Sequence, residues 1–117
     1  MAMEAEHRTE RTEELVAAAA LFHGLSDPSR LLIVRHLMLG EHRVVDLTAH
    51  LGLAQSTVSQ HLACLKDCGL VSSRPVGRAS MWSLNHLEQL EEVLETAEGL
   101  LGRTAVSPQH HYEEHHT

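Results

Sequence analysis

Aromatic residues are scarce in this sequence, which contains one phenylalanine, one tryptophan and one tyrosine: Phe22, Trp82 and Tyr112. Because the hydrophobic content is nonetheless 43%, the core must be built from aliphatic side chains and alanine. Strands favour aromatic and β-branched residues, so this composition favours helices over a β-sandwich. A chain of 117 residues is large enough for one small domain with tails.

Long apolar runs are also missing. No stretch approaches the roughly 20 residues needed to span a bilayer. The opening sequence MAMEAEHRTERTEE is acidic, where a secretory signal would be basic and then apolar. We therefore expect a cytoplasmic protein, in which two cysteines remain as free thiols.

Positive charge is in deficit, since the net charge is −7. The deficit is uneven: residues 28–84 carry six basic and three acidic side chains, a net of +3, so the flanks hold −10. An acidic frame around a mildly basic middle leaves one surface able to approach a phosphate backbone. The overall charge therefore does not exclude DNA as a partner.

Glycines divide the first part of the chain into segments. We predict a mobile arm over residues 1–11 and an alanine-rich helix over residues 12–24. A second helix is predicted to begin after Ser26 or Asp27, either of which can cap it, and to end at Gly40.

Two shorter helices follow. The first is predicted to start at Val45 or Asp46 and to end at Gly52, and the second to end at Gly69. Two short helices joined by a tight glycine turn are a helix-turn-helix. At about 100° per residue, three apolar side chains of the second helix share one face. This predicted buried face consists of Val58, Leu62 and Leu65.

The hydrophobic period then changes. Apolar residues around Val71 and over residues 81–84 predict two short strands, with a turn at RPVGR, residues 74–78. A helical period returns over residues 85–102, with glutamates on the outer face. The sequence thus predicts a mainly α fold with a small β-hairpin, a winged helix-turn-helix over residues 12–102, and a His-rich tail over 103–117.

Three segments carry a family resemblance: SDPSRLLIV, LTAHLGLAQSTVSQHLACLKDCGLV and GRASMWSL. They resemble the ArsR/SmtB family of metal-sensing bacterial repressors, whose pattern reads DPxR, then L(A)xxLGLxxSxVSxHLxxLxxxGLV, then GRxxxYxL. The resemblance covers about residues 20–100 and departs at Trp82, where the family usually has tyrosine. It implies a homodimer, joined by its first and last helices, that binds double-stranded operator DNA at an inverted repeat.

Polar side chains point away from the predicted buried face of the second short helix. Hydroxyls and amides can bond to phosphates and to base edges in a major groove, and hairpin arginines can contact phosphates or the minor groove. A plain solvated face is the alternative interpretation. The predicted DNA contacts are Ser56, Thr57, Ser59, Gln60, His61, Lys66, Arg74 and Arg78.

Cys64 and Cys68 lie four residues apart, about 40° from each other on that helix. They can be small packing residues, a disulfide strained by the helix, or ligands of a soft-metal site for Zn²⁺, Cd²⁺, Pb²⁺ or Cu⁺. The element CLKDCG resembles the CmtR-like cadmium- and lead-sensing branch of the family. There, two cysteines of the recognition helix pair with a donor from the other subunit's C-terminal region. The resemblance therefore assigns Cys64 and Cys68 as metal ligands.

The resemblance does not identify a third metal ligand in this chain, because the chain has no cysteine besides Cys64 and Cys68. The tract HHYEEHH can complete a tetrahedral site, scavenge metals nonspecifically, or be a solvated tail. We expect it to supply ligands and to shift the preference towards Zn²⁺; the candidates are His110, His111, His115 and His116. The remaining histidines of the predicted domain occur singly and are expected to be surface or boundary residues: His23, His36, His42, His50, His61 and His86.

These features predict a repressor that binds its operator as an apo dimer. Binding of Zn²⁺, Cd²⁺ or Pb²⁺ would release it and derepress metal efflux or resistance genes. A thiol-redox or sulfide-sensing repressor on the same fold, and a metal-storage protein that uses the tail, are the alternatives. The sequence contains no nucleophile–base constellation, phosphate loop or carboxylate pair, so we do not expect an enzyme.

Overall fold

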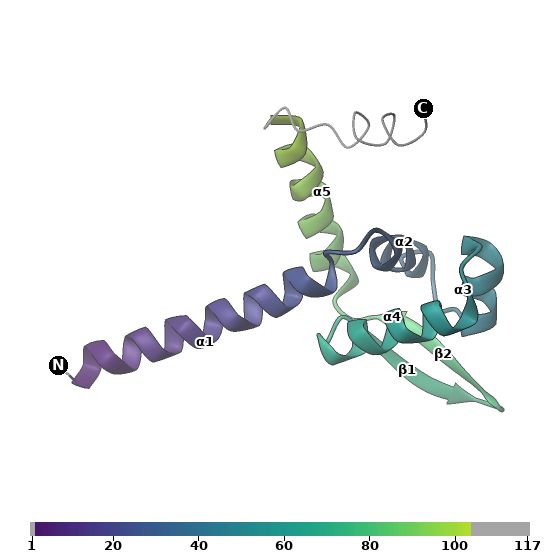
Figure 1. The fold of residues 1–117 in the computed structure, drawn as a ribbon, viewed down its shortest axis with the longest axis horizontal. Helices are drawn as coiled ribbons and strands as arrows, with labels where there is room; N and C mark the ends of the chain where they lie inside the picture. Colours follow the sequence, from purple (N-terminus) through teal and green to yellow (C-terminus); the bar gives the residue numbers. More distant parts are fainter. Residues whose placement is uncertain (1, 104–117) are drawn as a thin grey trace. The chain divides into compact units, whose positions relative to one another are not determined.

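The structure, a computed structural model, describes residues 2–103, with side chains from residue 5 onward. Within that range it contains five helices and one two-stranded antiparallel sheet, which Figure 1 shows in chain order. The chain divides into two units, Met1–Asn85 and His86–Thr117. The first unit holds α1 to β2, and the second holds α5.

α1 spans Ala2–Gly24, so the prediction of an arm separate from the first helix is wrong from Ala2 onward. The residues before Thr12 are mostly alanine, glutamate, methionine and arginine, which favour helices, and no glycine or proline interrupts them. The Thr12 hydroxyl, which could have capped a helix, instead donates to the carbonyl of Arg8 at 2.8 Å within α1.

Asp27 caps α2 (Pro28–Leu37), which confirms one of the two predicted caps. Its carboxylate accepts the backbone N–H of Arg30 at 3.0 Å, and this hydrogen bond is the main reason that the pKa of Asp27 is lowered. The Arg30 guanidinium donates to the carbonyls of Gly24 at 2.8 Å and His23 at 2.9 Å. It thereby ties the end of α1 to the start of α2.

The predicted helix-turn-helix is formed by α3 (Val44–Leu51) and α4 (Gln55–Asp67). Gly52 opens the turn with a φ of 67°, in the left-handed region that glycine adopts at low cost. Helices α2, α3 and α4 pack against one another. The buried face predicted for α4 is confirmed, because its three residues have no exposed surface: Val58, Leu62 and Leu65.

The predicted hairpin consists of β1 (Val71–Val76) and β2 (Ala79–Leu84). Its turn is tighter than predicted, because the strands pair up to the last residue of β1 and leave only Gly77 and Arg78 between them. Arg74 therefore lies within β1 and not in the turn. The strands contact all three helices of the core, α2, α3 and α4. The first unit is thus the expected winged helix-turn-helix (Figure 1).

α5 spans Leu87–Arg103, close to the helix predicted from the glutamate-rich repeat. The tail predicted over residues 103–117 lies outside the described residues after Arg103. Across residues 2–103, none of the helices is long and apolar enough to cross a membrane.

Candidate DNA interface and metal ligands

Outside its buried face, α4 exposes several polar side chains. Four of the predicted DNA contacts on this helix are exposed, whereas Thr57 is half-buried. Serine hydroxyls, a glutamine amide and a lysine ammonium there can donate to phosphates and base edges. We call this surface the polar face of α4; its exposed members are Ser56, Ser59, Gln60 and Lys66.

His61 does not belong to this face. Its Nε2 lies 3.6 Å from the Asp27 carboxylate, and its side chain is only 18% exposed. A half-buried imidazole beside an acid at the start of α2 is poorly placed to meet a phosphate. The structure therefore separates His61 from the other predicted contacts of α4.

The two wing arginines differ. Arg78 is exposed in the hairpin turn, as expected of a phosphate contact. Arg74 is paired with Glu41, with Nε–Oε2 and Nη2–Oε1 distances of 2.8 and 3.0 Å. Their hydrogen bonds lower the pKa of Glu41 and raise that of Arg74. Sequence reasoning missed this pair, because its members are 33 residues apart.

Trp82 connects the wing to the helices. The Lys66 ammonium lies 5.8 Å from the centre of the Trp82 ring, within range of a cation–π interaction. The backbone of Trp82 exchanges two hydrogen bonds with His42, at 3.0 and 2.8 Å. β2 is thereby held against both the recognition helix and the segment before α3.

Cys64 and Cys68 are free thiols, both half-buried at the C-terminal end of α4. The Cys68 Sγ lies 3.4 Å from the Ala20 carbonyl of α1. It also lies 3.0 Å from the point where a Cβ on Gly24 would stand, so Gly24 allows the close approach. Burial, and then the neighbouring Cys64 and Asp67, raise the pKa of the Cys68 thiol. A metal ion binding there would have to displace its proton.

The ligands predicted to complete the cysteine site fall outside the described residues: His110, His111, His115 and His116. Within the part of the chain that the structure describes, no third histidine, cysteine or acid joins Cys64 and Cys68 in a group that could hold a metal. Any further protein ligand of a metal ion held by Cys64 and Cys68 must therefore come from outside the described residues of the same chain.

Three of the histidines that occur singly in the sequence lie together in the structure, at half-buried or exposed positions. His36, His42 and His50 place one ligand atom each within 4.8 Å of one another. Burial, and then His42 and His50, lower the pKa of His36. Residues on α2, on the following loop and on α3 meet only because these segments pack together. Linear spacing gave no sign of this contact.

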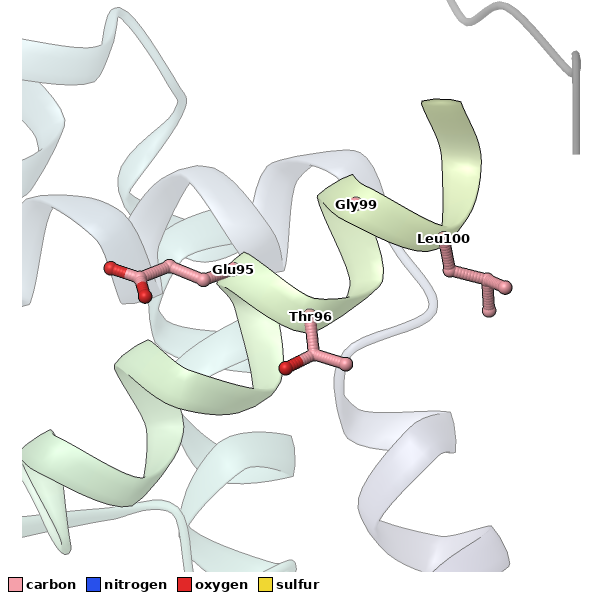
Figure 2. A pocket seen from close by; sticks show the side chains of 4 residues that line it. All are labelled: Glu95, Thr96, Gly99 and Leu100. Carbon is pink, nitrogen blue, oxygen red and sulfur yellow. The ribbon is translucent and has the colours of Figure 1, made fainter. Parts of the chain in front are cut away.

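A shallow hollow on α5 is lined by Glu95, Thr96, Gly99 and Leu100 (Figure 2). Figure 2 shows the Glu95 carboxylate directed away from Leu100, so the two ends of the lining differ in polarity. Among the described residues that line it, Glu95 alone is ionisable, and no nucleophile is paired with a base. This hollow therefore provides no catalytic constellation.

Residues 27–73, from the cap of α2 into β1, match the family described as bacterial regulatory protein, arsR family. The crystal structure of NolR from Sinorhizobium fredii is 32% identical to this chain, with a TM-score of 0.70. The alignment covers 80% of this chain and 92% of NolR. This chain belongs to the ArsR family.

Two further relatives bear on this ArsR-family chain. The transcriptional regulator CmtR of Mycobacterium tuberculosis is 44% identical over 68 residues, 58% of each protein. The second relative is a homodimeric winged helix-turn-helix DNA-binding domain from Mycobacterium bovis, described as a possible ArsR-family transcriptional regulator. It is 25% identical to this chain, with a TM-score of 0.72. The alignment covers 80% of this chain and 89% of the domain.

The chain spans only 53–58% of the length of the curated relatives that it matches first. CmtR is named a transcriptional regulator, and the Mycobacterium bovis domain a possible one. This agrees with the expectation that this ArsR-family chain is not an enzyme.

Proposed function

We propose that this ArsR-family chain is a metal-responsive transcriptional repressor that binds operator DNA as a homodimer. The observation that carries the proposal is the position of Cys64 on α4 and of Cys68 at its C-cap, since α4 also bears the polar face. A metal ion that pulls on the end of this helix would act directly on the DNA-reading surface. The effect of the metal on DNA binding would not have to be transmitted through other parts of the protein.

DNA binding would use the polar face of α4 and the exposed turn of the wing. Gln60 can bond bidentately to an adenine edge, while Ser56, Ser59 and, at its margin, Thr57 reach phosphates or bases. Arg78 and Lys66 would supply the salt-dependent attraction to the backbone. His61 and Arg74, which are engaged by Asp27 and Glu41, would contribute only after releasing these acids.

Dimerisation would use α1 and α5. Leu15 and Phe22 on α1 are 70% and 59% exposed, and Leu100 on α5 is 59% exposed. Large apolar side chains exposed together on a helix indicate an interaction surface, and the Mycobacterium bovis relative is homodimeric. A symmetric dimer with two recognition helices about one DNA turn apart would read an inverted repeat.

The regulatory ligand would be Zn²⁺, Cd²⁺ or Pb²⁺, bound by the thiolates of Cys64 and Cys68. Imidazoles from the C-terminal tail would complete the site, which favours Zn²⁺ relative to an all-thiolate site; the candidates are His110, His111, His115 and His116. A coupling free energy of about 3 kcal/mol would weaken DNA binding by roughly a hundredfold. Genes for metal efflux or resistance would then be expressed.

Fluorescence anisotropy of the full chain on its own promoter DNA tests this proposal. The apo dimer should bind, and stoichiometric Zn²⁺, Cd²⁺ or Pb²⁺ should release it. A Cys64→Ser, Cys68→Ser variant should bind the DNA equally well and stay bound when metal is added. A His23→Gln variant serves as the control that keeps the metal response. Release of the double-serine variant at the same metal concentration would contradict the proposal.

The same assay separates the thiol-redox alternative. The raised pKa of Cys68 disfavours the thiolate that reacts with peroxide or persulfide. If the pair is a metal sensor, these reagents, added without metal, should leave the DNA complex intact. Release by peroxide alone would favour the redox sensor instead, and several bound metals per chain without an effect on DNA would indicate storage.

A further inference from the structure

Three imidazoles converge at a point remote in sequence from the cysteine pair. His36 lies on α2, His42 on the loop that follows, and His50 in the last turn of α3. Their ring centres are 4.5, 4.9 and 5.8 Å apart, and one nitrogen of each lies within 4.8 Å of the others. Imidazole is a preferred ligand of borderline metals such as zinc and nickel.

The hydrogen bonding of His42 leaves one of its ring nitrogens able to bind a metal. Its Nδ1 lies 2.8 Å from the carbonyl oxygen of Gly40. A carbonyl only accepts hydrogen bonds, so Nδ1 carries the proton and Nε2 keeps its lone pair. Metal-bound histidines generally donate their second ring nitrogen to such a carbonyl. The backbone bridge between His42 and Trp82 fixes the residue further.

The other two rings face each other. Nε2 of His36 and Nδ1 of His50 lie 2.8 Å apart, so one donates a proton to the other. Tetrahedral zinc with bonds of about 2.0–2.1 Å places its ligand nitrogens about 3.3 Å apart. The pair would therefore have to open by about half an ångström. The exposed position of His50 at the end of α3 leaves its side chain room for this adjustment.

We propose that His36, His42 and His50 form a binding site for a borderline divalent ion such as Zn²⁺, Co²⁺ or Ni²⁺. The ion takes the place of the proton shared by His36 and His50, and that proton moves to the other nitrogen of the donor ring. Three nitrogen ligands leave at least one coordination position for water. The site contains no thiolate and does not depend on the proposed role of Cys64 and Cys68.

An ion held there joins α2 to α3 and, through the His42 backbone, to β2. It therefore crosslinks the scaffold on which α4 is held. Its expected effect is the opposite of the effect proposed for the cysteine site: it raises the thermal stability of the winged helix-turn-helix and does not pull on α4.

The test uses the full chain with the competing ligands replaced. This parent variant carries Cys64→Ser and Cys68→Ser, and glutamine at positions 110, 111, 115 and 116. Co²⁺ is the spectroscopic probe, and Zn²⁺ affinity is measured by competition with a chromophoric chelator. We expect one Co²⁺ per chain with visible d–d bands, no sulfur-to-cobalt charge-transfer band, and displacement by Zn²⁺.

Adding His50→Gln to the parent should lower the Zn²⁺ affinity at least tenfold and abolish the rise in melting temperature on adding Zn²⁺. His42→Gln should do the same and provides a second variant if the first is poorly folded, as judged by melting of the metal-free protein. His23→Gln, at an exposed position of α1, is the matched control and should change nothing.

Absence of stoichiometric Co²⁺ and Zn²⁺ binding by the folded parent would overturn the proposal. So would an unchanged affinity after His50→Gln or His42→Gln; the three rings would then form only a hydrogen-bonded cluster. Because this background lacks both cysteines, either result leaves the test of the cysteine sensor unaffected.

Discussion

Arg74 in β1 and Glu41 before α3 form a two-pronged ion pair, in which Nε–Oε2 and Nη2–Oε1 measure 2.8 and 3.0 Å. The pair uses the Nε and Nη2 donors of Arg74, and arginine binds phosphate through the same kind of two-pronged contact. A DNA phosphate would therefore have to compete with Glu41 for Arg74. Glu41 thus pairs with one of the positive charges that the wing would offer to DNA.

Glu41→Gln removes this competitor. We expect the variant to bind operator DNA more tightly and with a steeper salt dependence, because one more phosphate can be neutralised. The slope of log K against log salt should grow by about 0.9 per protomer, and so by about 1.8 for the dimer, measured by anisotropy over a salt series. Arg74→Ala is the control, and combining it with Glu41→Gln should remove the gain. Equal slopes for Glu41→Gln and the wild type would show that Arg74 contacts no phosphate.

Leu62 has no exposed surface at the centre of the buried face of α4. Leu62→Ala should lower the free energy of unfolding by about 2–5 kcal/mol, because a cavity remains. Gln60→Ala, on the polar face, should stay within about 0.5 kcal/mol of the wild type. Urea denaturation followed by circular dichroism measures both. Similar losses in the two variants would contradict the orientation of α4.

The orientation of α4 was predictable because it depends on local periodicity. Val58, Leu62 and Leu65 are buried together, as the helical repeat requires. The cap at Asp27 and the turn at Gly52 were predictable for similar reasons, since each depends on the chemistry of one residue and its near neighbours.

The features that the sequence did not predict depend on packing. His36 and His50 meet because α2 lies against α3, and Arg74 meets Glu41 because the wing folds back beside the segment before α3. The N-terminal extension of α1 was missed for another reason: the Thr12 hydroxyl can bond within a helix as well as cap one.

Asp27 should make stability depend on pH. Its carboxylate has a lowered pKa in the folded chain, chiefly through the hydrogen bond from the Arg30 backbone. The unfolded state therefore binds a proton more readily, so this stabilisation is present above the unfolded pKa of about 3.9 and is lost as the pH falls through the folded pKa.

Asp27→Asn isolates the effect, because asparagine also caps helices but does not titrate. We expect the stability advantage of the wild type over this variant to shrink as the pH falls from about 5 towards 3. Urea denaturation at each pH gives the difference, in which the contributions of other carboxylates cancel. A difference that persists unchanged at pH 3 would rule out the charge of Asp27 as the cause.

Cys68 should react slowly with alkylating reagents. Burial raises its pKa in the folded chain, and only the thiolate reacts. The pH midpoint of its alkylation by iodoacetamide should therefore lie above the midpoint in the urea-unfolded chain. Trypsin cleaves after Lys66, so Cys64 and Cys68 fall in different peptides and mass spectrometry can follow each thiol separately.

Metal protection in this experiment bears directly on the proposed sensor. If both thiolates bind one ion, one equivalent of Zn²⁺ per chain should slow the alkylation of Cys64 and Cys68 together, because each thiol is withdrawn from reaction by the same ion. Protection should persist after His50→Gln, since that change affects only the proposed histidine site. Protection of neither thiol at saturating Zn²⁺ would mean that the metal binds elsewhere and that the cysteines serve only in packing.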